Sequence, residues 1–214
     1  AGRLDEASEL LIRGDLIEYL PGKRLAGRLA SRLGDRAVQH SQGEDWQSAW
    51  SDLKSAIRLE GETRELLGVR QKLIEAGFAS IKQSLAAGDT NAALGLLDKL
   101  AGRQAPREAL DLFRQVTRQL QSADKLSRHG KFGDAESQLT AAIALAPDLK
   151  LLETKLDEVR TKREESRPLT EQLHRAAAEA RWSDALTVAD QLLELAPENR
   201  LAIDARRKAW TEVG

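Results

Sequence analysis

The 214-residue sequence contains no cysteine and no methionine, and only 4% of its residues are aromatic. Without a thiol, the chain is neither a disulfide-stapled scaffold nor a zinc or iron–sulfur protein with cysteine ligands. Its longest apolar runs extend over only a few residues, so we expect no insertion into a membrane. No charged start followed by an apolar core marks a signal peptide, and we expect a cytoplasmic protein.

An excess of charge of one sign is also missing, because 33 Lys and Arg residues stand against 34 Asp and Glu residues. The resulting net charge of −1 gives the chain as a whole no reason to bind nucleic acid. A hydrophobic content of 41% combined with this balance is typical of a folded chain rather than a disordered one. Since the sequence starts without methionine and runs straight into a helical pattern, we expect a fragment of a larger protein.

Features of β-strands are scarce, since no segment alternates apolar and polar residues over more than a few positions. Good helix formers dominate instead, and apolar residues recur at steps of three and four, as at Leu25, Leu29 and Leu33. The set Leu149, Leu152, Leu156 and Val159 repeats this pattern. The sequence therefore predicts an all-α protein with helices over 4–13, 23–42, 46–59, 62–87, 91–101, 106–129, 133–145, 149–165, 167–180, 184–195 and 199–212.

Glycine and proline mark the breaks between these helices. The dipeptide Arg167-Pro168 is interpreted as the start of a helix, because proline is tolerated in a first turn. Ser166 precedes it and would cap that helix with its hydroxyl group.

The breaks reveal an internal repeat, in which a tight turn leads into a helix with a fixed alanine. The four alanines are Ala49, Ala93, Ala135 and Ala185, at intervals of 44, 42 and 50 residues. A bulky residue or Thr stands three positions before each alanine, and apolar residues stand four and seven positions after it. Because a larger side chain would push two packed helix axes apart, we expect each alanine to lie where helices touch.

This pattern resembles tetratricopeptide (TPR) repeats, most closely in the segments 130–147 and 181–197, where a proline follows the alanine by twelve residues. TPR repeats run about 34 residues, so the first helix of each repeat would here be longer by two to four turns. The resemblance implies an α-solenoid of antiparallel helix pairs in which long and short helices alternate. One domain over 1–214 would comprise a cap at 1–22, repeats at 23–61, 62–105, 106–147 and 148–197, and a capping helix at 198–214.

No pattern in the sequence carries catalysis or metal binding. His40, His129 and His174 stand at different positions relative to the repeat alanines and show no ligand spacing. There is no Gly-x-Ser-x-Gly motif, and Gly22-Lys23 lacks the upstream glycine and the following Ser or Thr of a phosphate loop. We therefore expect a protein that is not an enzyme and uses no cofactor, metal or small-molecule substrate.

One predicted helix carries an arginine at every fourth position, at Arg24, Arg28, Arg32 and Arg36. This spacing places them along one stripe that drifts by about 40° per step. The stripe is either an anion-facing surface or a solvated row paired with the acids of Glu60 to Glu65, and we favour the second interpretation. Small residues share the helix and suggest that another helix or chain approaches closely, at Gly27, Ala30, Ser31 and Gly34.

The resemblance to TPR proteins implies that partners bind the wall formed by the first helix of each repeat. Positions assigned to that wall are Lys82, Gln121, Asp124, Arg128, His174 and Ala178. The Asn/Lys/Arg set with which chaperone-binding TPR domains clamp a C-terminal carboxylate is not recognisable in these helices, so chaperone-tail binding is not predicted.

We expect a non-catalytic protein–protein interaction scaffold that binds a peptide or helix of a partner. The resemblance implies a bacterial protein in which such a segment stands beside signalling modules. Two alternatives remain open: a structural element that assembles with copies of itself, and a binder of anions or nucleic acid through the stripe of Arg24, Arg28, Arg32 and Arg36. Nucleic acid is the less expected partner because the net charge is near zero.

Overall fold

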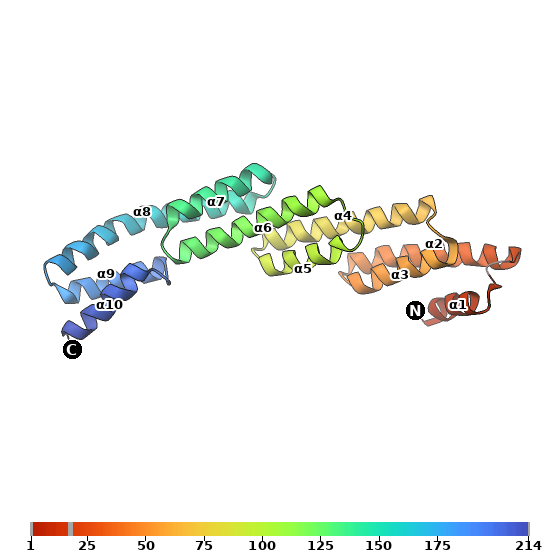
Figure 1. Cartoon of the computed structure of the whole chain (residues 1–214), viewed down its shortest axis with the longest axis horizontal. Coiled ribbons are helices and arrows are strands. Elements are labelled where there is room, and N and C mark those ends of the chain that lie inside the picture. The colour runs from red at the N-terminus through yellow and green to blue at the C-terminus, as the bar shows by residue number, and fades with distance from the viewer. Residues whose placement is uncertain (1, 17–18, 214) are drawn as a thin grey trace. The chain divides into compact units, whose positions relative to one another are not determined.

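A computed structural model describes residues 2–16 and 19–213 of the chain (Figure 1). Over these residues the protein has ten helices and no strand, which confirms the predicted all-α class. The helices are α1 (Gly2–Arg13), α2 (Leu20–Gln42), α3 (Trp46–Glu60), α4 (Arg64–Ala86), α5 (Thr90–Ala101), α6 (Arg107–Arg128), α7 (Phe132–Leu145), α8 (Lys150–Ala178), α9 (Trp182–Leu195) and α10 (Arg200–Val213).

The chain divides into two compact units, and the boundary falls within α4. The first unit comprises residues 1–81 and 102–105, with α1, α2, α3 and most of α4. The second comprises residues 82–101 and 106–214, with α5 to α10. The division of the sequence into one capped repeat domain stays a prediction.

The predicted helix break at Arg167-Pro168 is wrong. A single helix, α8, runs through this point for 29 residues with Pro168 inside it. Proline removes one backbone hydrogen bond and costs about 3 kcal/mol in a helix interior. Val159 on one side and Leu173 on the other are both buried, so packing on either side of the proline holds the helix continuous.

Ser166 therefore has no helix start to cap. Its hydroxyl group donates to the carbonyl of Arg163 at 3.0 Å, within the turn before the proline. Thr170 donates in the same way to the carbonyl of Ser166 at 2.8 Å. Both hydroxyl groups bond back into α8, which is the usual role of Ser and Thr in a helix interior.

The four helices that carry the repeat alanines, α3, α5, α7 and α9, begin in the same way. Each starts three positions before its alanine, at Trp46, Thr90, Phe132 and Trp182. In each preceding turn, the second residue before the helix has a positive φ: Glu44 (60°), Gly88 (77°), Gly130 (75°) and Ala180 (54°). The next amide then donates to a carbonyl five residues back, as Asp45 does to His40 at 3.0 Å and Lys131 to Leu126 at 2.9 Å. The internal repeat therefore extends to the backbone hydrogen bonds that close each long helix.

The repeat alanines are buried, with Ala49, Ala93 and Ala135 at 0% and Ala185 at 1% exposure. In the second unit, Ala185 belongs to a core drawn from three helices, α8, α9 and α10. Its buried members are Leu173, Ala176, Ala185, Ala189, Leu192 and Ala202. Alanine dominates this cluster because its small side chain lets the helices approach closely while still excluding water.

We expect Ala135→Leu and Ala185→Leu to lower the free energy of unfolding by roughly 1–3 kcal/mol each, because the added atoms overpack a closed helix contact. The matched control is Ala141→Leu on the exposed face of α7, which should change it by only about 0.2 kcal/mol. Urea denaturation followed by circular dichroism measures all three variants. Equal midpoints for the buried and exposed substitutions would show that the repeat alanines are not at packed contacts.

Within the second unit, the turn after α6 meets the turn before α10, although 69 residues separate them. The Glu198 amide donates to the Arg128 carbonyl at 2.9 Å, and His129 Nε2 lies 3.4 Å from the Glu198 carboxylate. A Cβ atom on Gly130 would lie 2.6 Å from Asn199 Nδ2. The absence of a side chain at Gly130 therefore leaves room for the Asn199 amide where the two turns meet.

This contact predicts a difference between two glycines with the same backbone conformation. Gly88→Ala should lower the free energy of unfolding by about 1–2 kcal/mol through the strain of a left-handed backbone alone, because nothing lies within 4 Å of the added Cβ atom. Gly130→Ala should lower the free energy of unfolding by roughly 0.5–2 kcal/mol more, because the Asn199 side chain must move and its Oδ1 accepts the Ala202 amide at the start of α10. Thermal unfolding of the two variants measures the difference, and equal losses would contradict the contact between the two turns.

Candidate interaction surface

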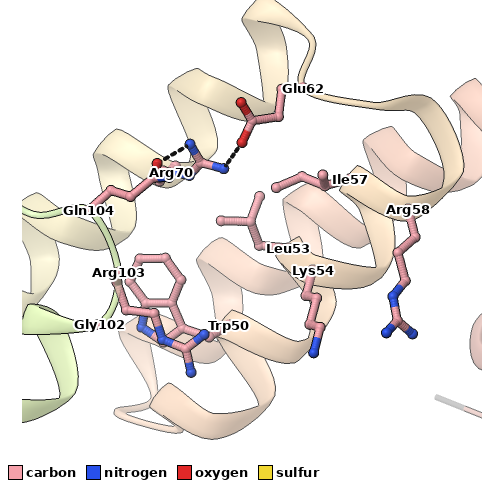
Figure 2. A pocket seen from close by; sticks show the side chains of 10 residues that line it. All are labelled: Trp50, Leu53, Lys54, Ile57, Arg58, Glu62, Arg70, Gly102, Arg103 and Gln104. Carbon is pink, nitrogen blue, oxygen red and sulfur yellow. Dashed lines mark hydrogen bonds and ion pairs between the residues drawn. The ribbon is translucent and has the colours of Figure 1, made fainter.

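An open pocket of about 320 Å³ lies against α3 in the first unit (Figure 2). Trp50, Leu53 and Ile57 follow one another at helical spacing, so one face of α3 supplies an apolar floor. The complete lining is Trp50, Leu53, Lys54, Ile57, Arg58, Glu62, Arg70, Gly102, Arg103 and Gln104. Three parts of the sequence thus build the pocket: α3 with the residues after it, α4, and the connection between α5 and α6.

Two of the cations at this pocket are held in place by neighbouring side chains. Figure 2 shows the Arg70 guanidinium between Gln104, whose Oε1 accepts a hydrogen bond at 2.7 Å, and the Glu62 carboxylate. The Arg103 guanidinium lies over the Trp50 ring, 5.2 Å from its centroid. Such stacking orients a guanidinium and contributes about 0.5–1 kcal/mol at an exposed site.

The pocket has more positive than negative charge. Four of its lining residues are cations and one, Glu62, is an acid already paired with Arg70. Lys54, Arg58 and Arg103 are exposed, and none of them forms an ion pair with another residue that the structure describes. The rim thus carries three positive charges available to a binding partner.

The predicted arginine stripe divides into two parts on α2. Arg24, Arg28 and Arg32 are exposed, and none of the three has an ion pair or hydrogen bond with another residue in the described ranges. Arg36 is different, because only 16% of its side chain is exposed. A drift of about 40° per step turns it by roughly 120° from Arg24, which brings it against α1 and α3.

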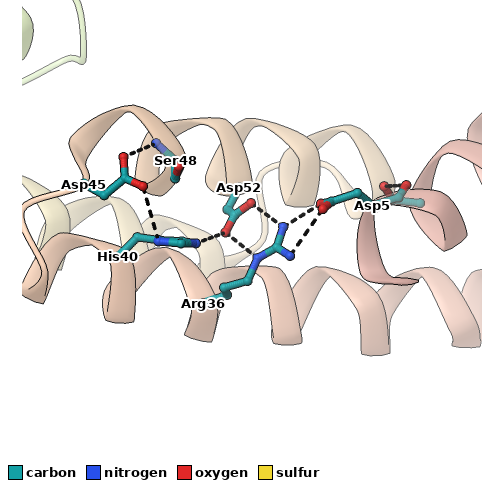
Figure 3. Close-up of polar contacts among 7 residues, drawn as sticks. Asp5, Arg36, His40, Asp45, Ser48 and Asp52 are labelled. Carbon is teal, nitrogen blue, oxygen red and sulfur yellow. Dashed lines mark hydrogen bonds and ion pairs between the residues drawn. The ribbon is translucent and has the colours of Figure 1, made fainter. Parts of the chain in front are cut away.

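Arg36 joins three helices through paired carboxylates (Figure 3). Its Nε and Nη2 atoms donate to the two oxygens of Asp52 on α3 at 2.7 and 2.6 Å, and Nη2 also donates to Asp5 on α1 at 2.6 Å. The hydrogen bonds that Arg36 donates to Asp52 and then to Asp5 raise the pKa of Arg36 above its ordinary value, against the opposing effect of burial. Asp52 is 6% exposed, and this guanidinium compensates its buried charge.

His40 lies beside the same group, with Nε2 3.7 Å from Asp52 Oδ2 and Nδ1 3.7 Å from Asp45 Oδ2. Asp45 caps α3 by accepting the Ser48 amide at 3.1 Å, and hydrogen bonds from the Ser48 side chain and amide lower the pKa of Asp45. His129 meets Glu198, and His174 is exposed. The described part of the chain contains no group of three or more His, Asp or Glu residues placed to hold a metal ion.

The acids of 60–65 were expected to pair with the arginine stripe, and this prediction is wrong. Glu65 accepts the Ser31 hydroxyl at 3.1 Å, and Glu60 lies against Gly27, where an added Cβ atom would approach its Oε1 to 3.1 Å. These acids face the small residues of α2, on a different side of the helix from the arginines. The close approach predicted from those small residues is confirmed, since a Cβ atom on Gly34 would lie 3.2 Å from Val69 Cγ2.

The remaining predicted site residues belong to the second unit and lie on three helices, α4, α6 and α8: Lys82, Gln121, Asp124, Arg128, His174 and Ala178. Gln121 is half-buried and donates to Thr90 Oγ1 at 3.1 Å, while Asp124 lies 3.8 Å from Lys155 Nζ. No side-chain hydrogen bond or ion pair among the described residues joins any two members of this set. Their role in partner binding stays a prediction.

None of the helices that the structure describes is long and apolar enough to cross a membrane. Comparison with protein-family models, with curated proteins and with solved structures finds no match. The basis for assigning a function is therefore the chemistry of the chain's own residues, above all those of the pocket beside Trp50.

The divided arginine stripe predicts unequal effects of substitution. Arg36→Ala should lower the free energy of unfolding by roughly 2–4 kcal/mol, because it leaves the buried Asp52 carboxylate without its partner. Arg32→Ala, one helical turn away and exposed, should change it by less than about 0.5 kcal/mol. Chemical denaturation measures both, and a loss at Arg32 as large as at Arg36 would contradict the division.

Proposed function

We propose that the protein is a non-catalytic interaction scaffold, a TPR-like α-solenoid of antiparallel helix pairs that binds a peptide or helix of a partner protein. The observation that carries the proposal is the pocket beside Trp50, which combines an apolar floor with a few polar groups at its rim. That combination is typical of binding sites, in which apolar surface supplies affinity and polar groups fix orientation.

The recurring turns support the solenoid part of the proposal. Four turns place a left-handed residue at the same position, and each leads into a short helix that buries an alanine. In the second unit, each helix from α5 to α10 packs against its neighbour in the sequence. Stacked repeats of this kind bury a continuous core and leave extended surfaces on which a peptide or helix can bind.

The chemistry of the pocket supports binding rather than catalysis. Its lining contains no serine, cysteine, histidine or aspartate, which are the usual nucleophiles and proton carriers. An arginine stays protonated at neutral pH and cannot act as a general base. The one carboxylate, Glu62, is paired with Arg70 and therefore has a structural role.

Selection of a random peptide library on the purified chain tests this function. A shared motif should be enriched, and synthetic peptides that carry it should bind the chain in solution and saturate at one peptide per chain. Sedimentation of the free chain over a wide range of concentrations is the companion measurement, and it should show a monomer. Failure to enrich any motif would overturn the proposal, and oligomers in its place would favour self-assembly as the function.

A further inference from the structure

We infer that the pocket beside Trp50 binds an acidic segment of the partner in which one large apolar side chain stands between carboxylates. This inference rests on the proposed function and names the chemistry of its ligand. It draws on three features of the pocket: the apolar floor, the excess of positive charge and the stacked arginine.

The apolar floor favours an apolar side chain of the partner as the anchor. Trp50, Leu53 and Ile57 form the bottom of the recess, and Trp50 and Leu53 are themselves buried, so an apolar group that enters contacts carbon atoms and leaves water. A volume of about 320 Å³ accommodates one or two side chains. Interfaces commonly gain most of their affinity from a few large side chains buried in such recesses.

The cations at the rim favour carboxylates on both sides of that anchor. Lys54 and Arg58 lie one turn apart on α3, and Arg103 lies across the pocket from Arg58 on the α5–α6 connection (Figure 2). None of the three is neutralised by another described residue, whereas Arg70 is already matched by Glu62. A segment with acids on both sides of its anchor complements this charge, and a basic segment is repelled by it.

The position of Arg103 suits the binding of a carboxylate. Stacking on Trp50 holds the guanidinium over the ring and leaves N–H groups at its edges free to donate. Paired N–H groups of this kind match the two oxygens of a carboxylate, and holding the side chain in advance reduces the entropy lost on binding. A polyanion without an apolar anchor would satisfy the cations but leave the floor uncovered.

Fluorescence anisotropy with a defined peptide panel tests the inference. Labelled peptides carry one Phe, Trp, Leu or Ile between runs of Glu and Asp, and matched peptides replace the anchor by Ala or the acids by Lys. At least one anchored acidic peptide should bind, and each replacement should weaken its binding by about tenfold or more.

Two pairs of matched variants locate the binding. Lys54→Glu combined with Arg103→Glu should weaken binding of the anchored acidic peptide by about tenfold or more. The control pair, Arg64→Glu with Lys72→Glu, lies exposed on α4 in the same unit and should change the affinity by no more than about twofold. Gly102→Trp should block binding because it adds bulk to the lining, and Gly95→Trp should not. An added Cβ atom meets nothing within 4 Å at either glycine, so both variants should fold, and their melting temperatures verify this.

Several results would overturn the inference. The first is that no anchored acidic peptide binds. The second is that the two double variants weaken peptide binding equally. The third is that an acidic peptide without an anchor, or heparin, binds as tightly as the anchored peptides. Peptides enriched from the random library that bind equally well to the pocket variants would leave the interaction function standing while removing this site. The two proposals therefore fail on different measurements.

Discussion

The close approach of helices at four alanines is the constraint on which the rest of the structure depends. Each alanine is completely or almost completely buried, and each lies one turn into a short helix that follows a left-handed turn. A side chain of larger size would separate the axes and open the core on both sides of the contact. The turn geometry, the start of each short helix and the burial of the leucines that follow all depend on that spacing.

A second constraint acts in the first unit, where one guanidinium holds three helices together. Arg36 binds carboxylates from α1 and α3 at once, and Leu11 is the buried apolar residue of α1. The charge on Asp52 is compensated inside the unit, so this part of the arginine stripe is unavailable to a partner. The exposed arginines beside it show that a regular spacing in sequence does not give its members a common role.

Helix positions and buried alanines could be predicted from the sequence because they depend on local spacing, glycine turns and apolar periodicity. Pro168 was misjudged because the apolar residues packed on both sides of it outweigh one lost hydrogen bond. The pairing of Arg36 and the pocket beside Trp50 could not be predicted, since each depends on which helices lie side by side. In the pocket, Arg70 comes from the next helix and Arg103 from the connection between α5 and α6, and no local pattern links them to Trp50.

The four turns share one geometry but not one residue type, and this difference affects how the chain moves. Gly88 and Gly130 adopt the left-handed conformation without strain, whereas Glu44 and Ala180 hold it at a cost of about 1–2 kcal/mol each. The copies of the repeat are therefore equal in architecture but unequal in local stability. The helices that begin alike give the matched comparisons, since Asp45 and Asp89 cap α3 and α5, whereas α7 and α9 have no side-chain cap. Amide protons at the start of α3 should exchange with solvent sooner than those of α5, and those of α9 sooner than those of α7.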